Sequence, residues 1–450
     1  MQKVYDIAII GGGAAGLMAA SYATKLLSES ALTAMGYLKA PSIVLLEKMP
    51  RPGRNLNITG KGSCNITNAK MWDEFAPHIH PNQQFLKNAF YNFSSAEVMK
   101  FFDSLGLDLV KERGDRVYPK SKRAMDVTDT LVNSIKNGGK VEMFAGCSVA
   151  GVVVQRSAED AENKVFAIEY NSAQGNIQKK DTILAKKILI TTGGLSYPTT
   201  GSTGDGYEIA KGFGHSIASC FPSLTALLPE GYKEYEGLSK IGKGLNGLLL
   251  KNISLALKID GNIAQEEFGD AEFTTGGLEG PLGFRVSRKA VAALNSGQKV
   301  SVVIDFKPAL SEEKLASRIA SDREKLSHLS ADKRITDNEL KRLLKGLLPM
   351  QIIAPFIHAS GLSFTAKQLA KALKNWELQI VGYVGYERAV VTAGGVSLKE
   401  VSPKTMESKL QPGLFFAGEV LDIDADTGGY NLQCAFSSAV LAMTTMLKQR

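Results

Sequence analysis

The stretch VYDIAIIGGGAAG, residues 4–16, joins an apolar run to a glycine-rich loop, and residues 17–27 continue with a helix-like pattern. This order of strand, loop and helix is the context that the G-x-G-x-x-G fingerprint of dinucleotide-binding proteins requires. The stretch therefore predicts the first half of a βαβ nucleotide-binding unit.

Each glycine of the fingerprint has a separate physical role. Gly11 permits the tight turn, Gly13 lets the backbone approach a pyrophosphate, and Gly16 allows the helix to pack closely on the strand. The N-terminus of the helix offers unpaired N–H groups to an anion. We assign these glycines, with Ala14 and Ala15 between them, to cofactor binding.

The run PSIVLLE, residues 41–47, predicts the second strand of the unit and ends in an acid. Glu47 is placed to accept hydrogen bonds from a ribose diol, and its charge would repel a 2′-phosphate. FAD or NAD therefore fits better than NADP. Because the crossover is long, we expect an extended helix or a small surface insertion around residues 28–39.

A polar loop, PGRNLNITGKGSCNITN at residues 52–68, follows directly after this strand. Its Gly, Asn and Thr residues offer many hydrogen bonds to an extended polar ligand, and its position favours a cofactor loop over a plain surface loop. From this region we assign to cofactor binding Lys48, Gly53, Arg54, Asn55, Thr59, Gly60, Gly62, Cys64 and Asn65.

Two further glycine clusters extend the predicted site. A buried run at 187–192 ends in Gly-Gly, and residues 414–417 deliver Gly418-Glu419, whose carboxylate can hold ribityl hydroxyls. Residues 428–431 open the last helix, and its N-terminal dipole would stabilise the negative charge of a reduced flavin. NAD needs no such element, so the clusters favour FAD. The residues assigned here are Thr192, Gly193, Gly194, Gly418, Glu419, Asp422, Gly429, Tyr430, Asn431 and Leu432, together with Val149.

Length and composition indicate a globular protein of two or three domains, since 450 residues exceed one core and 44% are hydrophobic. The net charge is +8, from 53 Lys and Arg against 45 Asp and Glu. Because the basic residues are scattered, a solvated surface is favoured over a nucleic-acid footprint. We therefore expect a small-molecule substrate and no nucleic-acid partner.

The cysteines and the apolar runs point to the cytoplasm. The four cysteines lie far apart and never form Cys-x-x-Cys, so they predict no zinc site and no dithiol motif. Asp6 interrupts the apolar N-terminus, which argues against a signal peptide. No run reaches the roughly 18 to 20 apolar residues that span a bilayer, so we expect no membrane partner.

The pattern of predicted elements changes in the middle of the chain. Short alternating segments at 141–144, 149–155, 164–170 and 176–183 predict an antiparallel meander before the strand at 187–192. From about 215 to about 385 we expect an insertion, first β-rich and then helical, between two halves of the nucleotide domain.

A second glycine pattern, residues 242–247, also matches G-x-G-x-x-G, but it precedes a strand-like run instead of following one. Residues 237–243 begin like a P-loop, yet Gly244 stands where a Ser or Thr must bind magnesium. We interpret both as β-turns. A pyridine-nucleotide disulfide reductase would carry a second genuine fingerprint, so that class is excluded.

These motifs resemble a bacterial family, the BaiN/RdsA-type NAD(P)/FAD-dependent oxidoreductases, some of whose members are known as aminoacetone oxidases. The resemblance runs end to end and is carried by residues 11–16, 60–68, 192–194 with 197–198 and 201–206, 392–396, 418–422 and 428–433. The chain departs from the family pattern at Ser63, where we expect arginine, and at Asn55 and Asn57.

The resemblance implies an α/β fold with an FAD-binding domain of the glutathione-reductase type, a parallel sheet with a β-meander. It also implies that a β-barrel-like plus helical domain interrupts it. We expect a discontinuous FAD-binding domain at 1–214 and 386–450, a β-barrel-like insert at 215–308 and 349–385, and a helical insert at 309–348.

The predicted function is an FAD-dependent oxidoreductase that transfers hydride between flavin N5 and a small organic substrate, with NAD(P)H as a possible transient co-substrate. One direction reduces a conjugated carbonyl compound with NAD(P)H. The alternatives are an oxygen-dependent oxidase of an amine or alcohol, and an RNA-associated flavoprotein suggested by pI ≈ 9.0.

No catalytic acid or base stands out, because the flavin does the difficult chemistry. The candidate proton handlers are Tyr430, Lys61, Tyr197, His215 and His358, and for each of them a structural role is favoured. Cys64 has no nearby partner cysteine, which favours packing over redox work.

His78 and His80 stand two apart in a loop that ends at a proline. Their surroundings in the sequence lack the carboxylates of a metal site, so we expect no metal.

Overall fold

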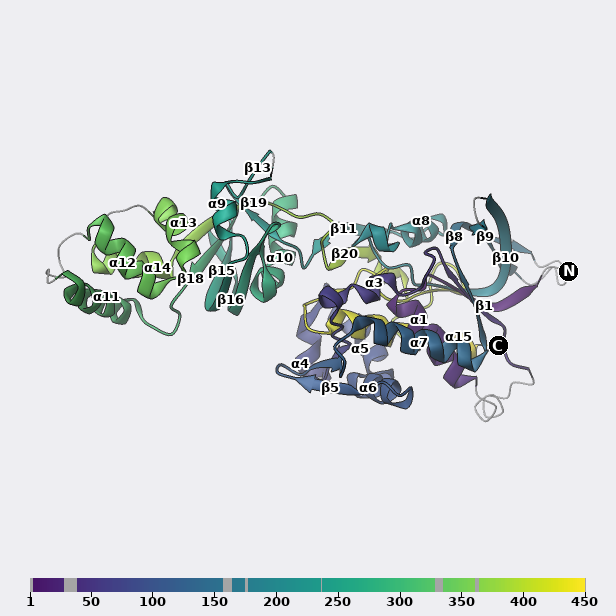
Figure 1. Cartoon of the computed structure of the whole chain (residues 1–450). Coiled ribbons are helices and arrows are strands. Elements are labelled where there is room, and N and C mark those ends of the chain that lie inside the picture. Colours follow the sequence, from purple (N-terminus) through teal and green to yellow (C-terminus); the bar gives the residue numbers. More distant parts are fainter. Residues whose placement is uncertain are drawn as a thin grey trace. The chain divides into compact units, whose positions relative to one another are not determined.

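The computed structural model describes residues 3–27, 39–156, 164–174, 177–235, 237–327, 335–360 and 364–449 (Figure 1). The chain divides into two compact units: Met1–Phe221 with Val390–Arg450, and Pro222–Ala389. The expected insertion at 28–39 lies outside the described residues, apart from Lys39.

The first unit is built on a seven-stranded sheet with the order β7-β2-β1-β10-β9-β8, and β21 pairs with β10 off this path. The strands are β1 (Val4–Ile10), β2 (Ile43–Glu47), β7 (Val141–Ala145), β8 (Cys147–Arg156), β9 (Lys164–Gln174), β10 (Ile177–Ile190) and β21 (Leu414–Phe416).

Strands β7, β2, β1, β10 and β21 pair in parallel, whereas β8, β9 and the first half of β10 form an antiparallel meander. The predicted parallel sheet with a meander is therefore confirmed. Parallel pairing sets the carboxyl ends of β1, β2 and β10 side by side, the usual place for a ligand in open α/β sheets.

Two details of the predicted meander are wrong. The segment near 141 forms β7, which pairs in parallel with β2, and the two strands expected at 176–183 and 187–192 are one strand, β10. Lysines interrupt the apolar pattern there. Lys187 nevertheless stays within the strand because its Nζ donates to the carbonyl oxygens of Met446, at 2.8 Å, and Gln449.

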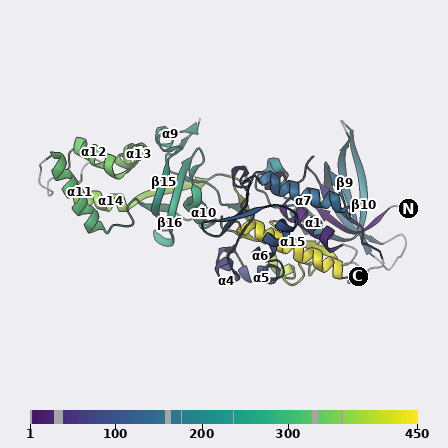
Figure 2. The ribbon, with the colours of Figure 1, turned by 60° about the horizontal axis from the view of Figure 1, so that its bottom comes forward.

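Three helices, α1 (Ala14–Leu26), α7 (Ala124–Gly138) and α15 (Tyr430–Lys448), pack beside one another in the first unit (Figure 2). The packing face of α1 is rich in alanine, and Ala19, Ala20 and Ala23 have no exposed surface. Small side chains let α15 approach α1 closely, so the last helix of the chain packs along the first.

The remaining elements of the first unit are short. They are α3 (Arg54–Asn57), η1 (Thr59–Gly62), β3 (Thr67–Asn68), α4 (Trp72–Phe75), η2 (Ala76–His78), β4 (Ile79–His80), α5 (Gln83–Asn92), α6 (Ser95–Ser104), β5 (Leu109–Glu112), β6 (Arg116–Pro119), η3 (Pro198–Thr200), α8 (Asp205–Gly212), β11 (Ile217–Ser223), which continues into the second unit, β20 (Val391–Val396), η4 (Leu398–Glu400) and β22 (Asp424–Ala425).

The second unit contains a closed antiparallel barrel with the strand order β12-β17-β16-β15-β18-β19. Its strands are β12 (Leu227–Pro229), β15 (Leu249–Ile259), β16 (Asn262–Thr274), β17 (Gly277–Glu279), β18 (Val300–Asp305) and β19 (Trp376–Tyr383). The barrel-like insert implied by the family resemblance is thus present. Helix α10 (Gly280–Asn295), not expected from the sequence, packs on β15 and β16 through a buried face that includes Val286 and Ala290.

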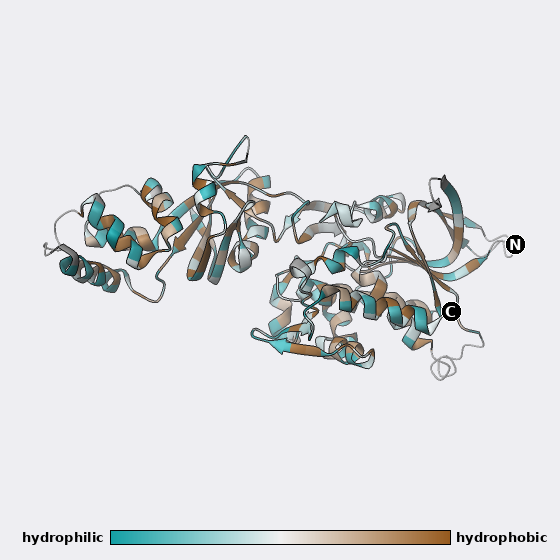
Figure 3. Ribbon diagram, in the orientation of Figure 1, coloured by the Kyte–Doolittle hydropathy of each residue, from teal (hydrophilic) through white to brown (hydrophobic). Residues whose placement is uncertain are grey.

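The second unit also carries a group of helices: α11 (Glu312–Ser327), α12 (Asp337–Leu347), α13 (Met350–Ser360) and α14 (Ala366–Lys374). Segment 349–385 supplies β19 to the barrel, whereas its helix α14 packs against α11. Figure 3 shows mostly hydrophilic colours along α11, in agreement with its charged sequence. The domain boundaries expected at 215, 309, 349 and 386 stay predictions.

The glycine patterns at 237–243 and 242–247 are not β-turns, which corrects both interpretations. The first begins in the short strand β14 (Gly237–Leu238), which follows β13 (Lys233–Glu234), and runs into α9 (Lys240–Leu245). The second lies mostly within α9, whose N-cap Ser239 accepts a hydrogen bond from Gly242 N. None of the helices in the described part of the chain is long and apolar enough to cross a membrane.

We expect Thr365→Ala to destabilise α14 by about 1 kcal/mol, the usual value of an N-cap. Thr365 Oγ1 accepts from Gln368 N at 3.3 Å, and Gln368 Oε1 accepts from Thr365 N at 2.9 Å, so the substitution breaks a reciprocal pair. Hydrogen exchange of the first amides of α14 measures the loss. Thr365→Ser keeps the acceptor and is the control; equal exchange in both variants would contradict the prediction.

Candidate functional site

The glycine loop between β1 and α1 is shaped by close backbone contacts. Gly11 has φ +106°, and a Cβ on Gly16 would lie 1.9 Å from Gly11 O. Thr191, at the end of β10, donates from Oγ1 to Gly11 O at 2.7 Å. Both glycines are thus required by the fold of the loop itself.

Gly13 differs from its neighbours because a Cβ there would meet no atom of the described protein within 4 Å. It is the N-cap of α1 and has no side chain to bond the first N–H groups of the helix. The loop therefore leaves space and free donors for an anion, as the approach of a pyrophosphate requires.

Glu47 lies at the end of β2 and is only 8% exposed. Its Oε1 accepts from Met49 N at 2.7 Å and its Oε2 from Gly12 N at 2.6 Å. Burial raises the pKa of its carboxyl, and these bonds offset that rise only in part. Each oxygen keeps a lone pair for a ligand hydroxyl.

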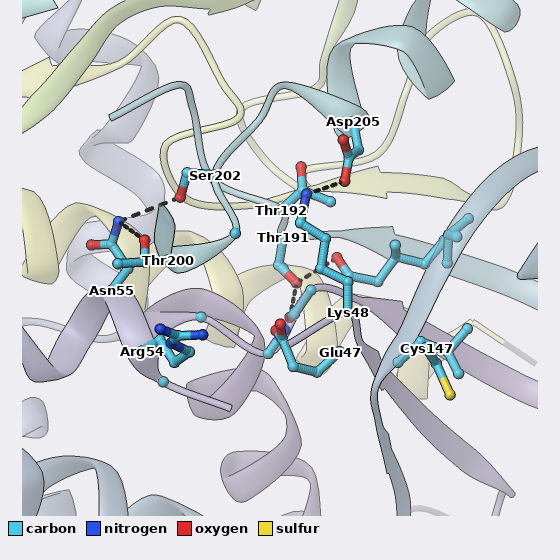
Figure 4. Close-up of a pocket in the computed structure, with 18 of the residues that line it drawn as sticks. Glu47, Lys48, Arg54, Asn55, Cys147, Thr191, Thr192, Thr200, Ser202 and Asp205 are labelled. Atoms are coloured by element: carbon cyan, nitrogen blue, oxygen red, sulfur yellow. Dashed lines mark hydrogen bonds and ion pairs between the residues drawn. The ribbon is translucent and has the colours of Figure 1, made fainter. Parts of the chain in front are cut away.

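A pocket opens at this edge of the sheet, with about 580 Å³ of space, part of it open to solvent (Figure 4). The predicted cofactor residues that line it are Gly11, Gly13, Glu47, Lys48, Gly53, Arg54, Asn55, Val149 and Thr192. Segments from β1, β2, α3, β8 and the end of β10 therefore meet in one place.

Other lining residues were not predicted to bind a cofactor. These are Ile10, Gly12, Leu46, Cys147, Thr191, Thr200, Gly201, Ser202, Asp205 and Ile209. The string at 201–206 carried the family resemblance, and its density of small polar residues was the signal that could have assigned it to the site.

The remaining predicted residues do not line this pocket: Ala14, Ala15, Gly16, Thr59, Gly60, Gly62, Cys64, Asn65, Gly193, Gly194, Gly418, Glu419, Asp422, Gly429, Tyr430, Asn431 and Leu432. Several of them are nonetheless brought together elsewhere in the first unit. A Cβ on Gly418 would lie 2.8 Å from Ala15 Cβ, which places the last glycine cluster against the first. Assignment of all these residues to FAD stays a prediction.

A second group forms around Glu419. Its Oε1 accepts from Thr392 N at 2.8 Å, and a Cβ on Gly194 would lie 2.8 Å from the same oxygen. Thr392 Oγ1 in turn accepts from Leu195 N at 2.8 Å. Burial raises the pKa of Glu419 to about 7.

The N-terminus of α15 lies against the polar loop. Gly429 has φ +94°, and a Cβ there would lie 2.4 Å from the carbonyl carbon of Thr67 and 2.9 Å from Asn65 Oδ1. Asn431 holds the preceding turn through bonds to Ala425 N at 2.8 Å and Ala425 O at 2.7 Å. The polar loop at residues 52–68 and the last glycine cluster, residues 428–431, therefore meet.

Two polar atoms near these segments are buried without a hydrogen-bond partner in the described structure: Asn65 Oδ1 and Thr192 Oγ1. An unpaired buried acceptor or hydroxyl costs about 1–3 kcal/mol, so such atoms mark places where a ligand can bond. With the open space at Gly13, these unpaired atoms are compatible with an extended dinucleotide.

The candidate proton handlers do not form one catalytic group. Tyr430 is 4% exposed and stacks on His78 with 4.2 Å between the ring centroids, and burial raises its pKa to about 12. Tyr197 has φ +54° and precedes η3, outside the pocket lining. The side chain of Lys61 lies outside the described structure.

The two candidate histidines lie outside the pocket. His215 is buried, its Nε2 pairs with Ser408 Oγ at 2.7 Å, and burial lowers its pKa, which indicates a neutral structural histidine. His358 is exposed on α13 in the second unit.

The sequence predicted no carboxylate beside His78 and His80, and this prediction is wrong. Asp426 Oδ2 lies 2.8 Å from His78 Nδ1, and Asp426 Oδ1 lies 3.2 Å from His80 Nε2. Burial works to raise the pKa of Asp426, but the two histidines outweigh it and lower the pKa to about 2. Among the described residues, no group of three or more His, Cys, Asp or Glu side chains could hold a metal ion.

Cys64 is buried beside the polar loop, and burial raises the pKa of its thiol to about 12. A thiol that stays protonated is a poor nucleophile, in agreement with the packing role expected from the sequence. Cys147, Cys220 and Cys434 are also free.

A parallel sheet, a meander and a glycine loop beside a buried acid at the end of β2 define the class of protein: a two-part dinucleotide-binding protein whose nucleotide domain is interrupted by a barrel. The chain belongs to the HI0933-like family, whose Rossmann-domain model matches residues 5–445. The predicted family is therefore confirmed. The prediction that the protein is an FAD-dependent oxidoreductase is confirmed with it.

Three curated relatives match along nearly the whole chain, each at 28% identity. One is the 3-dehydro-bile acid delta(4,6)-reductase of Clostridium scindens, matched over 97% of both chains. The others are the ribosomal RNA dihydrouridine synthases of Haemophilus influenzae, with 100% of both chains, and of Escherichia coli, with 97% of this chain and 96% of the relative.

Proposed function

We propose that this protein is an FAD-dependent reductase of a carbon–carbon double bond conjugated to a carbonyl group, with NAD(P)H as the source of hydride. The observation that carries the proposal is the full-length similarity to relatives named as a delta(4,6)-reductase and as dihydrouridine synthases. In a 3-oxo compound with double bonds at positions 4 and 6, the bond to be saturated is conjugated to the carbonyl group. The same is true of the double bond that is saturated in uridine.

Conjugation explains why one site architecture can serve both kinds of substrate. The carbonyl withdraws electrons from the far carbon of the double bond, so that carbon accepts hydride and its neighbour then accepts a proton. Bound FAD supplies the hydride chemistry, and the protein supplies binding, orientation and electrostatics.

The residues of the first unit would hold the cofactor along its length. Gly13 and the N-terminus of α1 would bind the pyrophosphate, Glu47 the adenosine ribose, and Glu419 the ribityl hydroxyls. Thr192 Oγ1 and Asn65 Oδ1, buried and unpaired in the described structure, would each gain a partner.

Rapid anaerobic mixing with NADH and with NADPH tests the proposal. We expect the flavin absorbance of the purified holoprotein to bleach within seconds, and a conjugated enone to restore it. No bleaching by either nucleotide would contradict the reductase. Bleaching by an amine or alcohol, followed by recovery with oxygen, would establish an oxidase in its place.

A second candidate substrate is a uracil base in RNA, favoured by the two relatives that are named for ribosomal RNA. The same reduced protein, mixed with ribosomal RNA, would then reoxidise, and RNA binding would weaken steeply as salt increases. Reoxidation by a steroidal dienone but not by RNA selects the small-molecule substrate. The scattered basic residues favour that outcome.

We also infer a reducing compartment, the cytoplasm, because all four cysteines are free thiols.

A further inference from the structure

The loop at residues 196–205 forms one wall of the pocket. Thr200, Gly201, Ser202 and Asp205 line the cavity from this loop, opposite the segment that runs from the end of β2 into α3 (Figure 4). The loop begins just after the middle glycine cluster and ends at the start of α8.

One end of the loop is bonded to Asn55. The Asn55 Nδ2 atom lies 3.3 Å from Ser196 O, 3.2 Å from Thr200 Oγ1 and 3.3 Å from Ser202 Oγ. An amide NH₂ group has two hydrogens, so it satisfies two of these acceptors at a time. Asn55 therefore spans residues 196–202 from a single side chain.

The other end is bonded to Lys48. Its Nζ lies 2.5 Å from Thr203 Oγ1 and 2.6 Å from Asp205 Oδ2, and Thr203 Oγ1 donates to Asp205 Oδ1 at 2.7 Å. The side chains of Lys48 and Asp205 are 21% and 35% exposed. A charge-assisted bond that is partly shielded from water holds better than a surface ion pair.

The backbone of the loop at Gly201 also lies close to Met49, which stands between Lys48 and Asn55 in the sequence. Gly201 has φ +113°, and a Cβ there would lie 2.9 Å from Met49 Cγ. The loop is thus held at both ends by polar bonds and packed against residue 49 in between.

We propose that residues 196–205 are a strap that closes over the adenosine end of bound FAD, and that Lys48 and Asn55 are the two latches that keep it shut. Both latches act on the strap, and FAD leaves only when they open. The inference rests on FAD binding by this pocket and is independent of which substrate is reduced.

The test measures how fast FAD leaves the holoprotein, without any substrate. An excess of a competing FAD-binding apoprotein traps released FAD, and fluorescence records the rate. Because latches oppose opening, the variants change dissociation more than association. We expect Lys48→Met and Asp205→Asn each to speed dissociation about 10-fold, and Asn55→Leu about 5-fold.

The double variant Lys48→Met with Asp205→Asn is decisive because the two residues share one bond. It should release FAD about as fast as either single variant. If Lys48 held FAD directly, Asp205→Asn would leave the rate unchanged or the two effects would multiply, and the strap would be refuted.

The control is Lys211→Met. It breaks the 2.8 Å pair between Lys211 and Glu208, which are exposed on α8, the helix that begins at Asp205. It should leave the dissociation rate unchanged. Hydrogen exchange of the amides at 196–205 gives a second readout: FAD should protect them in the wild-type protein, and much less in Lys48→Met. Equal protection in both would overturn the proposal.

Discussion

Gly16→Ala is expected to lower the affinity for FAD by more than about 100-fold and to destabilise the first unit by several kcal/mol. The added Cβ would lie 1.9 Å from Gly11 O and 2.8 Å from Thr191 Oγ1. Since backbone cannot yield as a flexible side chain does, α1 must move away from the sheet. Titration with FAD and thermal unfolding of the apoprotein measure the two losses.

Two other glycines separate loss of the fold from loss of the site. Gly13→Ala adds a Cβ in open space where the pyrophosphate is expected, so it should weaken FAD binding but leave the apoprotein stable. Gly212→Ala, at the end of α8, also meets nothing within 4 Å and should change neither quantity. Equal FAD affinity in Gly16→Ala and Gly212→Ala would contradict the assigned role.

The glycine loop was predictable because its requirements are local. Gly11 and Gly16 stand five residues apart. The strand, the turn and the start of the helix all lie within one continuous segment, residues 4–16. The same holds for the capping boxes at Thr336 and Thr365, whose partners stand three residues away. Local spacing therefore predicted the nucleotide-binding fold, and it also sets where the inserted helices α12 and α14 begin.

Contacts between distant residues were not predictable in this way. Lys48 meets Asp205 across 157 positions, and Asp426 meets His78 across 348. In the sequence alone, each residue of such a pair looks like an ordinary polar surface residue. Only the folded chain brings the two segments together. The same reason explains β10, where tertiary bonds to Lys187 keep one strand continuous through a polar stretch.

Glu419→Gln is the second substitution with a large expected effect, and its sign follows from the raised pKa. In the folded apoprotein burial raises the pKa of Glu419 to about 7, whereas an ordinary glutamate has 4.5. The folded state therefore binds the proton more tightly than the unfolded state. Stability falls as the pH rises from about 4.5 to about 7, by up to about 3 kcal/mol.

Glutamine mimics the neutral carboxyl, so Glu419→Gln should remove this part of the pH dependence. We expect the variant and wild-type apoproteins to unfold alike at pH 4, and the variant to be the more stable at pH 8. Denaturant unfolding at both pH values measures the difference. Parallel pH profiles would show that Glu419 is not the titrating group.

The same carboxyl makes FAD binding depend on protons. If ribityl hydroxyls donate to Glu419, they favour its charged form and lower its pKa, so FAD binding at pH 6 should release a proton. Calorimetric titrations in buffers of different ionisation enthalpy count that proton, and Glu419→Gln should abolish its release. Proton release that persists in the variant would place the coupling at another residue, with Glu47, whose pKa burial also raises, the next to test by Glu47→Gln.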